Sequence, residues 1–203
     1  MEKEIRLLNS NLELREVGED KEIHLQGYAL TFDSVSEDLG FRETIRRGAL
    51  DNCKMDNVVL NFNHDMDKPL ARNNKQGGKG ALTLTVDEKG LFFDAIPTNT
   101  SYARDLLENM KEGLIGKCSF AFSLDYNDQE SQSWDWDDGN RGYDFRTINK
   151  IDRLYDVSIV TNPAYESTSC TSYTRAKEEM NDEIKKAKEQ RELELLKIEL
   201  ELI

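Results

Sequence analysis

The chain has 203 residues, of which 37% are hydrophobic and 33% are charged, and its formal net charge is −13 at pH 7. This acidity argues against nucleic acid as a partner, because neutralising phosphates requires clustered Lys and Arg. The three widely spaced cysteines predict neither a disulfide scaffold nor a zinc site, so we expect a reducing compartment. No apolar run approaches the ~20 residues of a membrane span, and the N-terminus has no apolar signal segment. We therefore expect a cytoplasmic protein without a membrane partner.

Charge is distributed unevenly along the chain. The region 27–163 holds clear apolar runs and most of the glycines, whereas residues 175–203 contain no Gly, Pro or aromatic residue. In that last region Leu193, Leu196, Leu200 and Ile203 recur at spacings of three and four, which predicts an amphipathic helix. We therefore expect a folded domain over residues 1–173 and a charged helical tail over residues 174–203.

The folded region reads mainly as short strands. A turn at residues 18–21 separates two short strands, and an alternating or compact apolar pattern predicts further strands in several places. Asn99, Thr100 and Ser101 can cap a helix over residues 102–112, which Gly113 would end. Such a mixture favours a β-barrel or α+β fold over a parallel α/β fold. The further predicted strands are 22–32, 58–62, 115–124, 146–160 and a hairpin of 82–86 with 91–95.

The chain contains two histidines, and each is a candidate catalytic or metal-binding residue. His24 lies within an alternating strand pattern and is expected to face the surface. His64 ends an apolar strand between Asn63 and Asp65, a position from which an imidazole can project into a cleft; the residues alone leave a structural and a catalytic role equally open. His64 with Asp65 and Asp67 is a weak metal pattern, because catalytic zinc usually takes more His or Cys ligands.

A serine nucleophile needs a base within hydrogen-bond reach and a third group that orients the base. Ser119 lies in the middle of a predicted strand beside Cys118, which is a competing nucleophile because a thiolate is intrinsically stronger. Adjacent strand residues face opposite sides, so only one of the two can face a cleft. A small buried hydrophobe is the more usual role for Cys118.

The order of motifs resembles the caudoviral prohead protease family, the capsid-maturation serine proteases whose fold is related to the herpesvirus assemblins. The resemblance covers residues 27–165 and implies a mainly β or α+β fold, a herpesvirus-protease-like β-barrel flanked by short helices. It rests on Gly27-Tyr28-Ala29 with Phe32, Glu43 to Gly48-Ala49-Leu50, Asn63-His64-Asp65 with Pro69-Leu70-Ala71-Arg72, the hairpin 82–95, Ala103-Arg104-Asp105-Leu106, Gly116 to Phe122, and Asp156 to Tyr165.

The family pattern implies roles for three residues. The His of its Asn-His-Asp motif falls on His64, and the Ser of its Ser-Phe-x-Phe strand falls on Ser119. Asp156 occupies the acidic position before Val-Ser and is the expected third member, with Asp65 as its rival. The chain departs from the family at Ala71, where Gly is frequent, and at Cys118, where Met is frequent. Oxyanion donors are expected near residues 161–162 or from Arg72.

The resemblance implies a serine endopeptidase that cleaves scaffold or capsid protein, and itself, during phage prohead maturation. Its partners would be the scaffolding region of the major capsid protein or a separate scaffold protein, with a homodimer as a further expectation. No metal or organic cofactor is implied, and the site of action would be the host cytoplasm, inside the prohead. The alternatives are an inactive capsid-assembly or scaffold-binding protein with the same fold, and a metal-dependent hydrolase using His64 and Asp67.

Overall fold

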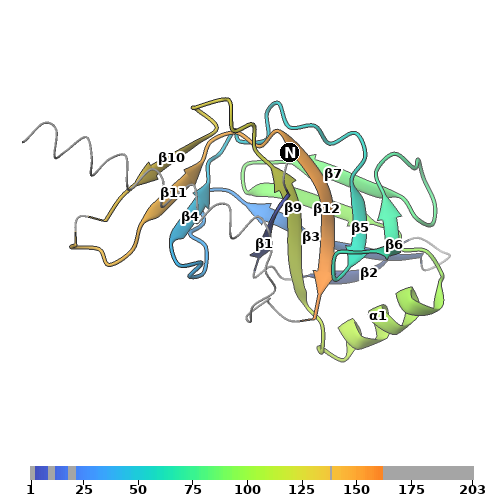
Figure 1. Cartoon of the computed structure of the whole chain (residues 1–203). Coiled ribbons are helices and arrows are strands. Elements are labelled where there is room, and N and C mark those ends of the chain that lie inside the picture. The colour runs from blue at the N-terminus through green and yellow to red at the C-terminus, as the bar shows by residue number, and fades with distance from the viewer. Residues whose placement is uncertain (1–2, 9–11, 18–21, 138, 162–203) are drawn as a thin grey trace, which may run out of the picture.

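The structure is a computed structural model that describes residues 3–8, 12–17, 22–137 and 139–161. Strands dominate this part of the chain and form three sheets (Figure 1). The predicted C-terminal helix and the predicted domain boundary at residue 173 lie outside the described residues. No helix in the described ranges has the length and apolar character needed to span a membrane.

The five-stranded sheet carries the residues singled out by the sequence. Its order is β1-β9-β12-β5-β6, in which β12 pairs with β9 antiparallel and with β5 in parallel. Strand β12 therefore lies between two segments that are far away from it in sequence. The strands are β1 (Glu4–Leu8), β9 (Lys117–Ser123), β12 (Arg153–Val160), β5 (Val59–Phe62) and β6 (Asp65–Arg72).

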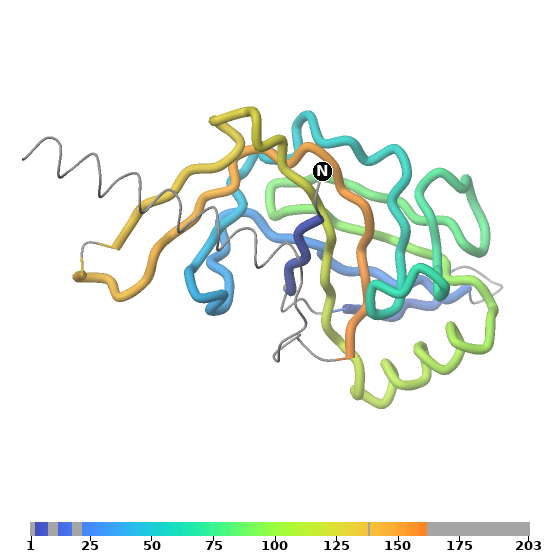
Figure 2. Tube along the Cα trace, viewed as in Figure 1, coloured from blue at the N-terminus to red at the C-terminus, as the bar shows by residue number. Residues whose placement is uncertain are grey.

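Two further sheets and one helix complete the described part. The four-stranded sheet contains the predicted hairpins, since β2 pairs with β3 and β7 pairs with β8, both antiparallel. Its order is β2 (Glu13–Val17), β3 (Glu22–Thr31), β8 (Gly90–Ala95) and β7 (Leu82–Val86), and the three-stranded sheet is β10 (Gln132–Asp135), β11 (Phe145–Ile148) and β4 (Arg42–Ile45). Helix α1 (Ser101–Lys111) follows the predicted range closely, and Gly113 behind it has a φ of 73°. Figure 2 follows the chain through these elements.

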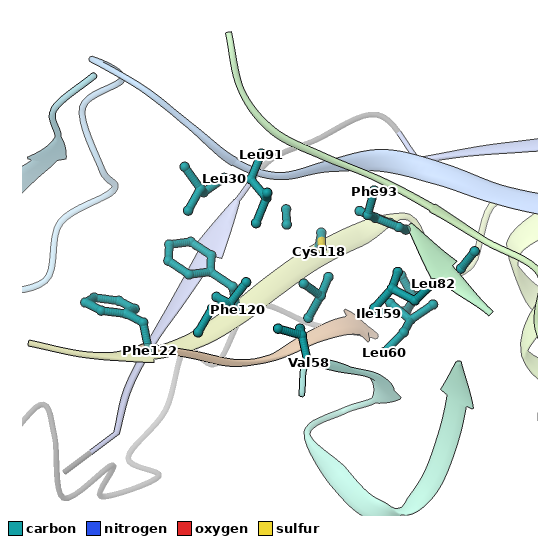
Figure 3. Close-up of a cluster of buried hydrophobic side chains, with 14 of the residues drawn as sticks. Leu30, Val58, Leu60, Leu82, Leu91, Phe93, Cys118, Phe120, Phe122 and Ile159 are labelled. Carbon is teal, nitrogen blue, oxygen red and sulfur yellow. The ribbon is translucent and has the colours of Figure 1, made fainter. Parts of the chain in front are cut away.

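The core lies between the five-stranded and four-stranded sheets. Alternating residues of β9, namely Cys118, Phe120 and Phe122, face Leu30 and Phe93 across this layer (Figure 3). All five are at least 97% buried, as expected where two sheets pack face to face. The residues between them on β9 therefore face the other side of the sheet.

The predicted barrel is not confirmed. In the described residues the strands form three open sheets, and the five-stranded one ends at β1 and β6. A barrel needs a continuous ladder of strand pairs around its circumference. Between β6 and the start of β7 there is an isolated bridge, Arg72 with Ala81, rather than a ladder. The fold is mostly β with one described helix, which agrees with the rest of the fold prediction.

Candidate active site

His64 lies in the two-residue turn that joins β5 to β6. Phe62 pairs with Asp65 across this hairpin, and the two turn residues, Asn63 and His64, have φ of 53° and 57°. Tight hairpin turns of the type I′ class need positive φ at both central residues, which asparagine tolerates better than most residues. The predicted strand end at His64 is confirmed, with the histidine in the turn itself.

Strand β12 holds this turn in place. The Asn63 amide donates to the Ile159 carbonyl oxygen at 2.9 Å, and the Asn63 side-chain oxygen accepts from the Thr161 amide at 3.1 Å. The His64 amide donates to Ser158 Oγ at 3.1 Å. These three bonds fix the backbone that carries the imidazole relative to β12.

Ser119 and Asp156 project from neighbouring strands on the same face of the sheet. In the β9–β12 ladder Ser119 lies opposite Ser158, and Ala121 lies opposite Asp156. Residues directly opposite each other share a face, and residues two apart on one strand also share it. Because Cys118 and its alternate neighbours face the core, Ser119 and Asp156 face away from it.

The imidazole of His64 bridges these two side chains. Its Nδ1 lies 2.6 Å from Asp156 Oδ1, and its Nε2 lies 2.6 Å from Ser119 Oγ. An ionised carboxylate can only accept a hydrogen bond, so we assign the ring proton to Nδ1. Nε2 is then free to accept the hydroxyl proton of Ser119, which is the tautomer that a general base requires.

The site is enclosed by protein. The side chains of His64 and Asp156 are 18% and 5% exposed, and Ser119 is 1% exposed. Low exposure strengthens the electrostatic attraction between the carboxylate and an imidazolium, because little water screens it. The arrangement can therefore stabilise a positive charge on His64.

Ser158 supports both other members of this arrangement and was missed in the sequence. Its hydroxyl donates to Asp156 Oδ1 at 3.1 Å and accepts from the His64 amide. The signal was available, because a residue two positions after Asp156 on a strand shares its face.

The two rivals named from sequence lie elsewhere. Cys118 is fully buried on the core face, and burial raises the pKa of its thiol to about 12. Asp65 forms an ion pair with Lys68 at 2.9 Å and accepts from the Asp67 amide at the same distance. The hydrogen bond from Lys68 is the main cause that lowers the pKa of Asp65. Asp156, not Asp65, is the carboxylate on His64.

His24 lies on the face of its strand turned away from the core, as predicted, because its neighbour Leu25 is fully buried on the core face, but His24 is only partly exposed there. Its side chain is 16% exposed, and its Nδ1 lies 2.7 Å from Asp94 Oδ1 on the adjacent strand β8. Strand β3 lies between β2 and β8, so side chains of the two neighbouring strands flank His24. Alternation of polar and apolar residues predicted the strand but not its central place in the sheet.

The expected oxyanion donors do not converge on Ser119 in the described residues. The Thr161 amide is used by Asn63, and Arg72 donates to the Asn57 side-chain oxygen at 3.1 Å. Residue 162 lies outside the described ranges.

A carboxylate, an imidazole and a hydroxyl in one hydrogen-bonded chain form the arrangement of serine hydrolases. A family model described as caudovirus prohead serine protease matches residues 10–183. The chain therefore belongs to the caudovirus prohead serine protease family, and the resemblance seen in the sequence is confirmed.

Among solved structures, the capsid assembly protease gp21 of bacteriophage T4 is similar to this chain, with a TM-score of 0.49 and 15% sequence identity. The similarity covers 80% of this chain and 98% of the gp21 chain. No curated protein sequence matches the chain.

Proposed function

We propose that the chain is a serine endopeptidase in which Ser119 is the nucleophile, His64 the general base and Asp156 the orienting carboxylate. The observation that carries the proposal is the continuous hydrogen-bonded chain from Asp156 through His64 to Ser119, with both distances at 2.6 Å. The three residues come from separate segments of the sequence, so a local turn does not account for their meeting.

The mechanism that follows is acyl transfer. Ser119 Oγ attacks the peptide carbonyl carbon while its proton passes to His64 Nε2, and the ionised Asp156 stabilises the imidazolium. His64 then gives that proton to the leaving amine, and the acyl-enzyme forms. Water attacks the ester, again with His64 as base, and releases the second product. Ser158 keeps the Asp156 carboxylate oriented toward the ring.

The proposed substrates are the scaffolding region of the major capsid protein or a separate scaffold protein, and the chain itself. This assignment rests on membership of the prohead protease family, which acts in capsid maturation. The proposed place of action is the inside of the prohead in the host cytoplasm, and a homodimer is a further proposal.

The test is intact mass over time for the wild type and Ser119→Ala, each co-expressed with the capsid and scaffold proteins of its own virus. Ser123→Ala is the matched control, because Ser123 is a buried serine on the same strand and the same face. We expect discrete trimmed products from the wild type and Ser123→Ala, and none from Ser119→Ala.

Other outcomes select among the alternatives. If no chain is trimmed in any of the three experiments, the inactive assembly protein becomes the better description. If EDTA abolishes trimming while a serine-directed phosphonate does not, the metal-dependent hydrolase replaces the triad.

A further inference from the structure

The proposed nucleophile is covered by the chain's own N-terminal strand. Ser119 is 1% exposed, and its Oγ donates to the Arg6 carbonyl oxygen of β1 at 2.9 Å. A second peptide carbonyl cannot approach a hydroxyl that is enclosed in this way. Substrate can therefore reach Ser119 only when the segment around Arg6 has moved.

Strand β1 lies where an extended peptide would add to the sheet. It pairs antiparallel with β9 at the end of the sheet order, with Leu7 opposite Ser119 and Arg6 opposite Phe120 (Figures 1 and 2). Peptides that add to a sheet edge gain affinity from backbone hydrogen bonds and selectivity from alternate side chains. The family match begins at residue 10, beyond this strand.

The alternate side chains of β1 enter a buried site of opposite charges. Glu4 accepts from Arg146 at 2.7 Å and from the Tyr126 hydroxyl at 2.6 Å. Arg6 donates to Glu43 through two of its nitrogens. Arg146 is fully buried and Glu43 is 3% exposed, so both β1 charges are held away from water by built-in partners.

The same site can remain neutral without β1. Arg146 Nη1 lies 3.3 Å from Glu43 Oε2, so the two partners already contact each other. A buried pair that keeps its counter-charge avoids the cost of an isolated buried ion. The site is thus suited to releasing one Glu-x-Arg segment and accepting another.

The bond to Arg6 also affects the chemistry at Ser119. A serine hydroxyl has one proton to donate. The Arg6 carbonyl oxygen, at 2.9 Å, and His64 Nε2, at 2.6 Å, compete for that proton, so the bound strand lowers the fraction of molecules in which His64 can accept it. The bound strand therefore covers Ser119 and also competes with His64 for the Ser119 proton.

We propose that β1 is a substrate-like strand of the chain, bound in its own peptide groove. The groove is the β9 edge together with Glu43 and Arg146, and it selects extended peptides that carry Glu two residues before an Arg whose carbonyl reaches Ser119. This inference rests on the proposed function for the role of Ser119.

The test measures binding of a fluorescent hexapeptide with the sequence of residues 3–8, Lys-Glu-Ile-Arg-Leu-Leu, to the full chain carrying Ser119→Ala. The apparent affinity equals the intrinsic affinity multiplied by the fraction of molecules whose groove is free. Adding Glu4→Gln with Arg6→Gln weakens the chain's own strand, and we expect the peptide to bind about tenfold or more tightly to this chain. A peptide with Gln in place of both charged residues should bind to neither.

The matched control adds Glu13→Gln with Arg15→Gln, which changes the same Glu-x-Arg spacing in the exposed pair on β2. This control should bind the peptide no better than the Ser119→Ala chain. Leu7→Pro offers a second way to loosen β1 that leaves Glu4 and Arg6 in place, because proline disfavours strand pairing. The proposal is overturned if the peptide binds to the Ser119→Ala chain as well as it binds to the chains that also carry Glu4→Gln with Arg6→Gln or Leu7→Pro. This holds whether the peptide binds to all of these chains or to none.

This result is separate from that of the proposed function, because a chain with Ser119→Ala binds without cleaving. If the peptide binds as expected but the wild type trims nothing, the proposed protease function is refuted and the proposed peptide groove stands. If the wild type trims its substrates but the chains do not differ in peptide affinity, the proposed protease function stands and the proposed peptide groove is refuted.

Discussion

Two histidine–aspartate pairs of nearly equal geometry occur in different sheets of this molecule. His64 Nδ1 lies 2.6 Å from Asp156 in the five-stranded sheet, and His24 Nδ1 lies 2.7 Å from Asp94 in the four-stranded sheet. Both histidine side chains are largely buried, with 18% and 16% exposed. Distance to the carboxylate and burial of the histidine therefore do not distinguish the two pairs; Asp156 is 5% exposed and Asp94 is 30% exposed, but each carboxylate lies against Nδ1 of its histidine in the same way.

The difference lies at the other ring nitrogen. His64 Nε2 meets the hydroxyl of Ser119 at 2.6 Å, whereas His24 Nε2 has the carboxylate of Glu22 at 4.0 Å. A general base in acyl transfer needs a neighbouring hydroxyl or thiol that gives up its proton and then attacks the substrate. An ionised carboxylate has no proton to give. A histidine–aspartate pair can thus be purely structural, and the third partner decides whether it can carry out acyl transfer.

Replacing the histidines gives the largest expected contrast. His64→Ala should lower the rate of scaffold or capsid cleavage by about 10⁶-fold, as loss of the base does in serine proteases. His24→Ala should leave the rate per folded molecule within about twofold, because His24 lies in the four-stranded sheet whereas the proposed triad belongs to the five-stranded sheet. Timed intact-mass measurements on both variants check this, and a similar fall in the two would refute the comparison.

Replacing the aspartates gives the next contrast. Asp156→Asn should lower the cleavage rate by about 10⁴-fold, because an amide no longer stabilises the imidazolium or fixes its tautomer. Asp94→Asn is the matched change in the other pair and should leave the rate per folded molecule unchanged. Cleavage rates at neutral pH, corrected for folded fraction by circular dichroism, separate the two roles; an active Asp156→Asn chain would point to another orienting group.

The buried carboxylate of Glu4 has arginines as partners in place of histidine. Burial opposes its ionisation, but the charges of Arg146 and Arg6 outweigh burial and lower its pKa from 4.5 to about 2. The contribution of ionised Glu4 to the stability of the folded chain is therefore complete above pH 4.5 and is lost as the pH falls from 4.5 to about 2. A shift of this size corresponds to a free energy on the order of 3 kcal/mol.

We expect the wild type to lose more unfolding free energy than Glu4→Gln across that pH range, as measured by urea unfolding. Glu13→Gln, at an exposed position, should follow the wild type. Parallel profiles for the wild type and Glu4→Gln would show that the arginines do not hold the Glu4 carboxylate ionised.

The smallest expected effect concerns Ser158. Ser158→Ala removes one hydrogen bond to the Asp156 carboxylate and one from the His64 amide. Because hydrogen bonds to charged groups contribute about 1.5 kcal/mol or more, the cleavage rate should fall about tenfold. Ser158→Thr keeps the hydroxyl and should recover most of the rate; failure of this rescue would indicate that lost packing, not orientation, caused the fall.

Much of the fold was predictable where the determining interactions are local. The hairpin of β7 and β8 and helix α1 follow from alternation, turn residues and the glycine behind the helix, all within a few positions of one another, although Thr100 at the N-cap makes no side-chain capping hydrogen bond. His64 and Ser119 were likewise placed correctly at a strand end and on a strand. Their meeting with Asp156 was predicted from the family resemblance, because no local pattern shows which strands become neighbours.

The features that were missed depend on distant partners. Strand β1 was not predicted, since Glu4 and Arg6 look like exposed residues until Glu43 and Arg146 are placed beside them. The contact of His24 with Asp94 was not predicted for the same reason, because the two residues are 70 positions apart. The barrel was favoured by the number of short strands and implied by the family resemblance, and neither specifies whether sheet edges join.

The position of β12 between β9 and β5 also has a consequence for synthesis. Asp156 follows His64 by 92 residues, so at about 5–20 residues per second the ribosome delivers it some 5–20 s later. Until then the chain lacks both Asp156 and the strand that brings β9 and β5 together. Under the proposed mechanism, a nascent or truncated chain that ends before β12 would not cleave its neighbours, so translation itself would delay the onset of the proposed activity.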